Sequence, residues 1–225
     1  MTIGRHLPSV LLGLAALVAP VRAQTLPLLE TAPTKPDPAI RYVFYLHGQI
    51  IEREGRRPTH PRFGVYEYDD ILRELAGSGA QIISEQRPPN TDVAAAARGI
   101  SEQVRSLLDA GVPATRIAVV GFSKGGRIAI ATSSILREPI TYVFLAACNR
   151  GVFDDETHRV SGRVLSVYEE SDDIGVSCEP LLERSPEVVE SREVRISTGE
   201  RHGAFYRPRE EWLDETIRWI RQPVE

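Results

Sequence analysis

The chain has 225 residues, of which 42% are hydrophobic and 26% charged, with 17 glycines, 16 prolines and a formal net charge of −4. This composition is that of a globular protein and excludes collagen, coiled coils and disordered chains. The negative charge argues against a nucleic acid partner, because phosphate binding needs clustered cations.

Residues 1–23 have the pattern of a secretory signal peptide. Arg5 and His6 precede an apolar run over 10–18, and short side chains follow at the cleavage positions. The run is far shorter than the ~20 residues of a membrane-spanning helix. We therefore expect cleavage after residue 23, no stable membrane anchor afterwards, and a secreted or periplasmic protein.

The remaining sequence predicts a leader and a single domain. Residues 24–39 are rich in proline and lack periodicity, which predicts an extended leader. No change in composition and no internal repeat divides residues 40–225. We therefore expect one domain over that range.

Within the domain, apolar runs alternate with segments of helical spacing. The runs that predict strands cover residues 42–46, 81–83, 117–120, 142–145, 164–168 and 193–196. The segments that predict helices cover residues 68–76, 93–107, 126–136 and 208–220. Continuous apolar runs are typical of strands buried on both faces. The alternation predicts an α/β fold, with a mostly parallel sheet of about six strands and helices on both faces.

Local signals predict how two of these helices begin and end. Asn90 or Thr91 is expected to cap the helix over 93–107, and Gly111 to stop it. Pro208 suits the first turn of the last helix.

Residues 121–126 read Gly-Phe-Ser-Lys-Gly-Gly between a predicted strand and a predicted helix. A sharp strand-to-helix turn with an exposed serine has no room for large side chains two positions away, so glycines flank Ser123. The same turn directs the Lys124 N–H toward an oxyanion forming on an acyl group. A phosphate-binding loop is excluded because Arg127 and Ile128 replace its lysine and its serine or threonine.

A serine becomes a nucleophile when a base accepts its proton and a third group orients that base. His202 follows the strand over 193–196, at the sheet edge where sites of α/β proteins form. The acid should lie after the preceding strand, where residues 169–173 include four carboxylates. We favour Asp172 over Asp173, because the strand needs a few residues to clear the sheet and because Glu169 and Glu170 are expected to be solvated.

A second oxyanion donor is expected after the first buried strand, at His47-Gly48-Gln49. Gly48 permits a close backbone approach, and the N–H of Gln49 is the candidate donor. Phe63, Val65, Tyr66, Phe205 and Tyr206 are candidates for an acyl pocket, with the core as the alternative for these side chains.

These residues resemble those of the α/β-hydrolase superfamily: a first strand ending in His47-Gly48, an elbow at Ser123, then Asp172 and His202 in that order. The resemblance covers residues 40–220 and implies a serine hydrolase that acts on esters through an acyl-enzyme, without a cofactor. Small secreted bacterial esterases without a cap, and the dienelactone-hydrolase-like group, are the nearest comparisons. The latter usually carries a cysteine where this chain has Ser123.

The two cysteines are expected to form a disulfide. Cys148 and Cys178 follow the strands over 142–145 and 164–168, and neighbouring parallel strands bring such loops within the roughly 7 Å that a bridge needs between Cα atoms. An exported protein also meets an oxidising compartment. The spacing of histidines and cysteines predicts no metal site.

The sequence therefore predicts an exported esterase with catalytic Ser123, Asp172 and His202, oxyanion donors Gln49 and Lys124, and a small acyl substrate. The alternative is a non-catalytic binding or envelope-interaction protein on the same scaffold, since a fold does not determine function. Neither the preferred acyl group nor the oligomeric state follows from these residues.

Overall fold

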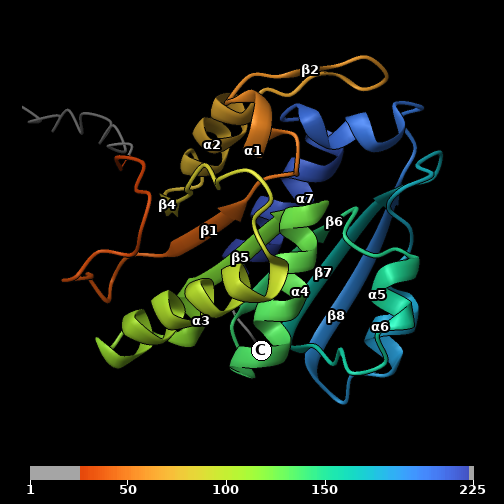
Figure 1. Cartoon of the computed structure of the whole chain (residues 1–225). Helices are drawn as coiled ribbons and strands as arrows, with labels where there is room; N and C mark the ends of the chain where they lie inside the picture. The colour runs from red at the N-terminus through yellow and green to blue at the C-terminus, as the bar shows by residue number, and fades with distance from the viewer. Residues whose placement is uncertain (1–25, 223–225) are drawn as a thin grey trace, which may run out of the picture.

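The computed structural model describes residues 26–222, which form a parallel sheet between two layers of helices (Figure 1). The predicted signal peptide lies outside the described residues. The six strands are ordered β4-β1-β5-β6-β7-β8, and every neighbouring pair is parallel. Their bounds are β1 Tyr42–Leu46, β4 Gln81–Ile83, β5 Ile117–Phe122, β6 Thr141–Leu145, β7 Ser161–Glu169 and β8 Glu187–Ile196. The predicted fold class is confirmed.

The pleat of the strands divides the core between the two faces of the sheet. In β1, Val43 and Tyr45 pack with helices α2 (Tyr68–Ala76) and α7 (Glu210–Arg221). Phe44 and Leu46 pack on the opposite face with α3 (Val93–Asp109) and α4 (Lys124–Leu136). Successive side chains of a strand point to opposite faces, so an entirely apolar strand requires helices on both.

Short elements complete the described chain. Helices α1 (Ile51–Glu54), α5 (Arg150–Asp154) and α6 (Glu179–Glu183) each span about one turn, and the 3₁₀ helices are η1 (Ala114–Arg116) and η2 (Arg201–Tyr206). Strands β2 (Thr59–His60) and β3 (Gly64–Val65) form a small antiparallel hairpin. Only α5 lies between β6 and β7, so no cap domain is inserted there. None of the helices over residues 26–222 is long and apolar enough to cross a membrane.

Two local predictions were wrong. Asp92 caps α3, because its carboxylate accepts the Ala95 N–H at 2.7 Å, whereas the Thr91 hydroxyl donates to the Pro88 carbonyl. Pro208 precedes Arg209, the N-cap of α7, and therefore lies outside the first turn of that helix.

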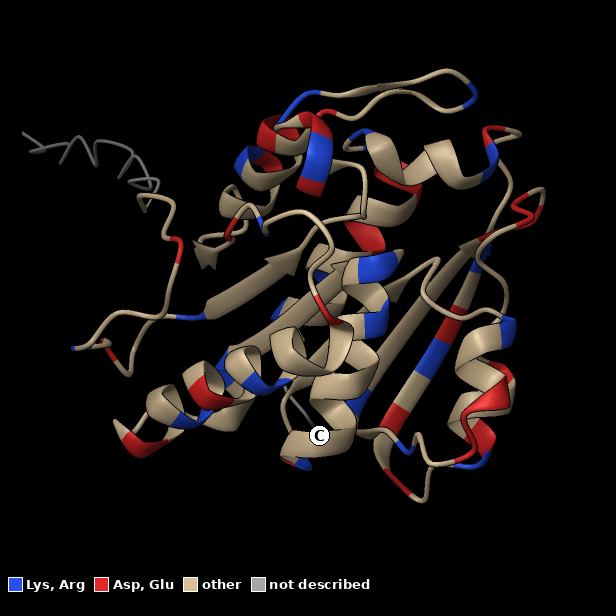
Figure 2. Cartoon of the chain, in the orientation of Figure 1, with Lys and Arg blue, Asp and Glu red and all other residues tan. Residues whose placement is uncertain are grey.

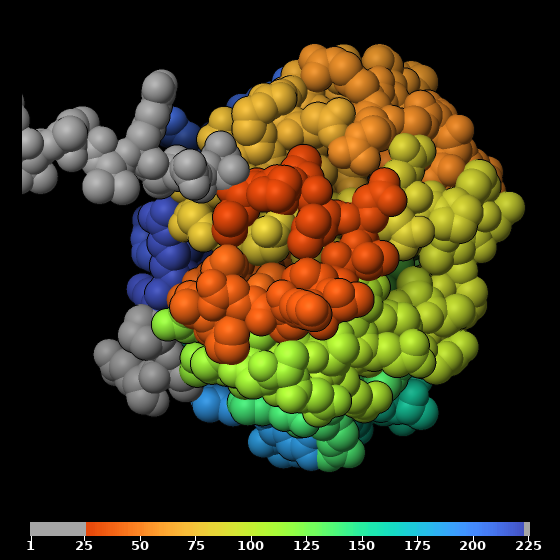
Figure 3. Space-filling model, turned by 90° about the vertical axis from the view of Figure 1, so that its left-hand side faces the viewer, coloured from red at the N-terminus to blue at the C-terminus, as the bar shows by residue number. Residues whose placement is uncertain are grey.

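The two edges of the sheet are protected differently. At β4, the leader adds an isolated parallel bridge: Leu29 donates to the Ile82 carbonyl at 3.0 Å and accepts the Ser84 N–H at 2.7 Å. Figure 3 shows the leader, in red and orange, lying against the surface beside α3. At the opposite edge, acidic and basic residues alternate along β8 (Figure 2).

Candidate active site

Ser123 lies in a strained turn between β5 and α4. Its backbone has φ 55° and ψ −117°, a conformation that costs an L-residue on the order of 1–3 kcal/mol. The Ser123 N–H donates to the Leu145 carbonyl of β6 at 2.9 Å, and the Ser123 carbonyl accepts the Arg127 N–H at 3.0 Å. The neighbouring strand and the first turn of α4 therefore hold the serine in this conformation.

Steric crowding explains the glycines on either side of Ser123. A Cβ on Gly121 would lie 2.3 Å from the Gly125 carbonyl oxygen, and a Cβ on Gly125 would lie 1.8 Å from the Leu46 carbonyl oxygen. Both are backbone atoms that cannot swing aside. The turn thus requires glycine at these two positions, in agreement with the sequence argument.

Ser123, His202 and Asp172 form a continuous chain of hydrogen bonds. His202 Nε2 lies 2.8 Å from Ser123 Oγ, and His202 Nδ1 lies 2.7 Å from Asp172 Oδ2. The side chains of His202 and Asp172 are 5% and 0% exposed, so water does not compete for the bond between them. With a proton on Nδ1, Nε2 is free to accept the serine proton.

The two candidate acids have different partners. Asp172 directs one carboxylate oxygen to His202 and accepts the Ile174 N–H with the other at 2.9 Å. Asp173 is exposed and forms an ion pair with Arg62 of the β2–β3 hairpin at 2.6 Å. This hydrogen bond lowers the pKa of Asp173. The structure thus brings Asp172, and not Asp173, to the histidine.

Glu169 has a structural role that the sequence did not reveal. It was expected to be solvated, but it is 1% exposed. One of its oxygens accepts the Thr198 and Gly199 N–H groups at 2.9 Å, and the other accepts the Ser171 N–H at 2.7 Å. Burial opposes its ionisation, but these hydrogen bonds prevail and lower its pKa. Glu169 therefore joins the loop of Asp172 to the loop that leads to His202.

A disulfide joins Cys148 to Cys178, with the Cα atoms 5.3 Å apart. Both residues are buried, and the Cys148 carbonyl accepts the Val176 N–H at 2.9 Å. The bridge ties the segment after β6 to the far end of the Asp172 loop. The predicted pairing is thus present in the structure.

The candidate oxyanion donors lie on two neighbouring elements. Lys124 begins α4 directly after Ser123, and Gln49 follows β1, which pairs with β5. Within residues 26–222 neither backbone N–H donates to another group. Neither amide is therefore engaged within the described residues, which is a condition that an oxyanion donor must meet.

A buried ion cluster lies beneath these donors and was not foreseen. Glu52 of α1 has no exposed side-chain surface; it accepts from Lys124 Nζ at 2.7 Å and from Arg87 Nε at 3.3 Å. Arg87 also donates through Nη2 to the His47 carbonyl, one residue before Gly48. The cluster connects the first turn of α4 with the loop of Gln49. Its members lie 35 or more positions apart, so no local pattern indicates the contact.

His47 contacts Arg87 of the same cluster and is itself a neutral side chain. Its Nε2 accepts the Arg87 N–H at 3.0 Å, and its Nδ1 lies 2.8 Å from the Gly48 carbonyl, to which it donates. Burial, followed by the nearby Arg87 charge, lowers the pKa of His47 to about 3. His47 therefore supports the Gln49 loop without carrying charge near neutral pH.

Aromatic side chains enclose the His202 ring. The Phe122 ring centroid lies 4.8 Å from that of His202, and the Phe63 centroid lies 5.7 Å from it. Phe63 is partly exposed and comes from the turn of the hairpin, whereas Tyr66, Phe205 and Tyr206 are buried in the core. Of the predicted pocket residues, Phe63 thus combines exposure with a position beside the histidine. No group of three or more His, Cys, Asp or Glu residues in the described part could hold a metal ion.

The parallel sheet, the serine elbow after β5 and the order Ser123, Asp172, His202 define the α/β-hydrolase fold. A family model described as Phospholipase/Carboxylesterase matches residues 80–152, which include the elbow. This match covers about a third of the chain; together with the fold it supports a relation to the α/β-hydrolases and a hydrolase of the carboxylesterase type.

Solved structures agree on the fold at low sequence identity. A predicted CIB-like hydrolase of Thermoplasma acidophilum is 18% identical with a TM-score of 0.54, and the match covers 80% of this chain and 86% of that chain. An esterase of Pyrococcus furiosus is 16% identical with a TM-score of 0.53, covering 83% and 85%. A phospholipase/carboxylesterase of Dyadobacter fermentans is 12% identical with a TM-score of 0.57, covering 88% and 100%. No curated protein sequence matches the chain.

Proposed function

We propose that the protein is an exported serine hydrolase that cleaves carboxylic esters or related acyl bonds through an acyl-enzyme. The observation that carries this proposal is the continuous hydrogen bonding from Ser123 Oγ through His202 to the buried Asp172. A binding protein would have no need of a strained serine whose hydroxyl contacts a base that is itself oriented by a carboxylate.

In the acylation step, Ser123 Oγ attacks the carbonyl carbon of the substrate while His202 Nε2 accepts the hydroxyl proton. The imidazolium that forms is stabilised by Asp172, which remains ionised. His202 then gives the proton to the leaving alkoxide, so the alcohol departs and an ester of Ser123 remains. Water attacks this acyl-enzyme by the same sequence, with His202 as the base, and releases the carboxylic acid.

The negative charge on the carbonyl oxygen needs donors that are in place before the reaction. The N–H groups of Lys124 and Gln49 fill this role in the proposal, supported by their lack of other partners in the described structure. The Glu52 cluster fixes both donor segments, so the donors need not reorganise as the charge develops.

Export is supported by the signal pattern of residues 1–23 and by the disulfide, which is typical of proteins in oxidising compartments. The substrate is a small acyl compound, and no cofactor takes part.

A fluorophosphonate probe tests the proposal, because it phosphonylates an activated serine and not a serine that merely lines a pocket. We expect labelling of the wild-type protein at Ser123 and hydrolysis of p-nitrophenyl esters. In Ser123→Ala, labelling should vanish and turnover should fall by about 10⁴-fold or more. Ser134→Ala, at a partly buried serine in α4, is the matched control and should retain both. Wild-type protein that resists the probe would favour the binding-protein alternative.

A further inference from the structure

Gly48 lies between two peptide units, and three of the four polar groups of these units have partners. In the first unit, the His47 carbonyl accepts from Arg87 Nη2, and the Gly48 N–H donates to Tyr66 Oη at 3.2 Å. In the second unit, the Gly48 carbonyl accepts from His47 Nδ1 at 2.8 Å. The fourth group is the Gln49 N–H, which donates to no other group within residues 26–222. The group without a partner is thus the candidate oxyanion donor.

The three partners decide the direction of the Gln49 N–H. A glycine backbone rotates more freely than that of any other residue, so Gly48 by itself does not fix the second peptide unit. A less flexible residue does not fit easily in its place, because a Cβ there would lie 3.0 Å from Phe122 Cε1. Both peptide units are planar, and a bond to either end of a unit therefore orients the whole unit. The conformation of Gly48 thus depends on the hydrogen bonds at its own N–H and carbonyl.

Tyr66 presents its hydroxyl to Gly48 from a fixed position. Its side chain has no exposed surface, and its ring stacks on that of Tyr206 with the centroids 4.7 Å apart. The Phe122 ring meets it nearly at a right angle, with the centroids 5.8 Å apart. Its Oη also lies 3.0 Å from Tyr45 Oη, in a hydrogen bond that either hydroxyl can donate. The packed ring leaves the hydroxyl no freedom to follow a displaced loop.

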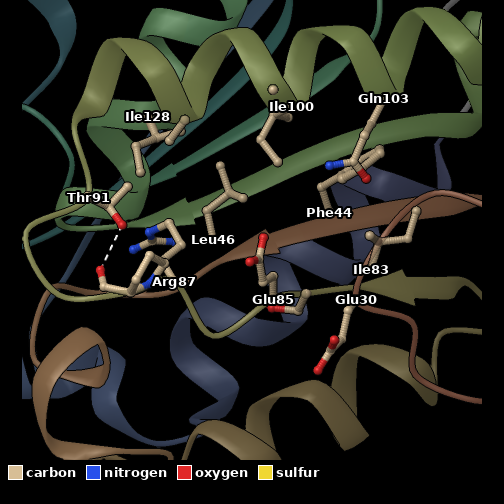
Figure 4. Close-up of a pocket in the computed structure, with 14 residues that line it drawn as sticks. Glu30, Phe44, Leu46, Ile83, Glu85, Arg87, Thr91, Ile100, Gln103 and Ile128 are labelled. Carbon is tan, nitrogen blue, oxygen red and sulfur yellow. Dashed lines mark hydrogen bonds between the residues drawn. The ribbon is translucent and has the colours of Figure 1, made fainter.

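The loop of Gln49 is less well packed on the other face of the sheet. A cavity of about 210 Å³ lies there, between α3, the β1–β4 side of the sheet and the leader. Figure 4 shows Leu46, the last residue of β1, on one side of this cavity and Ile100 of α3 on the other. Side chains that line a cavity have fewer van der Waals partners. Tyr66 belongs to the core of the opposite face, so its contact restrains the loop from the better packed side.

We propose that Tyr66 is a positioning residue for the oxyanion donor Gln49. Its hydroxyl accepts the Gly48 N–H, fixes the first peptide unit and thereby sets the direction of the Gln49 N–H in the second. This inference rests on the proposed function, because the donor acts on the oxyanion that forms from an acyl substrate. Tyr66 acts through the backbone of the loop and not on the substrate.

Tyr66→Phe tests this role, with Tyr45→Phe as the matched control. Each substitution removes one hydroxyl of the same buried pair and keeps the ring, but only Tyr66→Phe removes the acceptor of the Gly48 N–H. With p-nitrophenyl acetate, Tyr66→Phe should lower kcat at least about tenfold at an unchanged KM, because the donor acts in the transition state and not in the bound ester. Complete removal of an oxyanion donor costs ~10²- to 10³-fold, which sets the upper limit. Tyr45→Phe should stay close to the wild-type kcat.

A transition-state analogue gives a readout that a loss of stability does not change. Ser123 Oγ adds to the carbonyl carbon of butyl trifluoromethyl ketone, the serine proton passes to His202, and the carbonyl oxygen becomes an oxyanion. Its inhibition constant should rise in Tyr66→Phe by the factor by which kcat/KM falls, and should not change in Tyr45→Phe. Labelling to completion with the fluorophosphonate counts the folded sites, so kcat is expressed per folded site.

The outcomes separate this inference from the proposed function. Equal losses of kcat in Tyr66→Phe and Tyr45→Phe would make the hydroxyl of Tyr66 a structural group only and overturn its assignment. A wild-type kcat and inhibition constant in Tyr66→Phe would overturn the assignment as well. Both results leave the proposed function intact, because the wild-type protein still hydrolyses the ester. A wild-type protein that neither hydrolyses the ester nor reacts with the fluorophosphonate would instead overturn the proposed function, and this inference with it.

Discussion

On the acid side of the candidate site, the loops of Asp172 and His202 are held by N–H groups gathered on Glu169 and by the Cys148–Cys178 disulfide. On the nucleophile side, the first turn of α4 and the loop of Gln49 are held by Glu52 together with the buried Arg87 and the partly buried Lys124. The loops of the acid side are thus held by neutral donors and a covalent bond, whereas those of the nucleophile side are held by charged side chains.

Because the two sides are held by different interactions, we expect them to respond differently to the loss of a carboxylate charge. Removing the charge of Glu169 leaves neutral donors that an amide oxygen can still accept. Removing the charge of Glu52 leaves the buried Arg87 and the partly buried Lys124 without a carboxylate, which destabilises the fold strongly. The nucleophile side is therefore the more sensitive to a change of charge.

The largest expected effect comes from the acid that contacts His202. Asp172→Asn should lower kcat for a p-nitrophenyl ester by about 10³- to 10⁴-fold, because an amide stabilises neither the required tautomer nor the imidazolium. Asp173→Asn, next to it, loses only the exposed ion pair with Arg62 and should stay within a few-fold of wild type. His202→Gln should resemble Ser123→Ala. Similar kcat values for the two aspartate variants would remove Asp172 from its proposed role.

Matched substitutions compare the two carboxylates directly. Glu52→Gln should lower the free energy of unfolding by about 3 to 5 kcal/mol, because it leaves the buried Arg87 and the partly buried Lys124 without a carboxylate. Glu169→Gln should cost about 1 to 2 kcal/mol, because its partners are neutral N–H and O–H groups. Urea unfolding followed by tryptophan fluorescence measures both. If Glu169→Gln proves the more damaging, the comparison of the two sides is wrong.

Loss of the disulfide tests the acid side alone. The bridge closes a loop with a sequence separation of 30, so Cys148→Ala/Cys178→Ala should lower stability by about 2 to 4 kcal/mol. Mild reduction should lower kcat before the domain unfolds, since the bridge ends in the loop that carries Asp172. Activity and circular dichroism recorded along a reductant titration separate the two events. Coincident loss of both signals would contradict this order.

One of the smaller expected effects is the pH dependence contributed by His47. Its folded pKa of about 3 lies below the ordinary value of ~6.5, so below pH ~6.5 the unfolded chain binds a proton that the folded chain does not. Its contribution to stability is therefore complete above pH ~6.5 and is lost as the pH falls toward the folded pKa. Between pH 7 and 5 the loss should be about 2 kcal/mol. His47→Gln should reduce this slope in urea unfolding, and an unchanged slope would show that His47 titrates normally.

Most of the strand residues and the three hydrogen-bonded side chains of the site could be predicted because their signals are local. Residues 187–192, the first part of β8, were not predicted because charged side chains interrupt the apolar pattern there. β1 is apolar throughout, and the glycines that flank Ser123 lie four positions apart in the sequence, at 121 and 125. The order of the parallel strands then brings the loops of Asp172 and His202 to one edge. The catalytic roles of Ser123, Asp172 and His202, and of the donors Gln49 and Lys124, stay predictions.

The missed features depend on contacts between distant segments. Glu169 was expected in solvent because a carboxylate usually lies there, and only the positions of Thr198 and Gly199 explain its burial. The Glu52 cluster likewise joins three separate elements. The cap of α3 was misplaced by one or two residues, since three adjacent polar side chains compete for that position and only the Asp92 carboxylate reaches the Ala95 N–H.

The single bridge made by Leu29 has a consequence for the solubility of the protein. β8 carries charges along its open edge, which discourage pairing with another chain, whereas β4 consists of Gln81, Ile82 and Ile83 and has none. The leader covers β4 instead, through two backbone hydrogen bonds to Leu29. A chain trimmed to begin at β1 would expose this short apolar edge together with one wall of the cavity. Such a chain would be prone to self-association even with every residue of the candidate site in place.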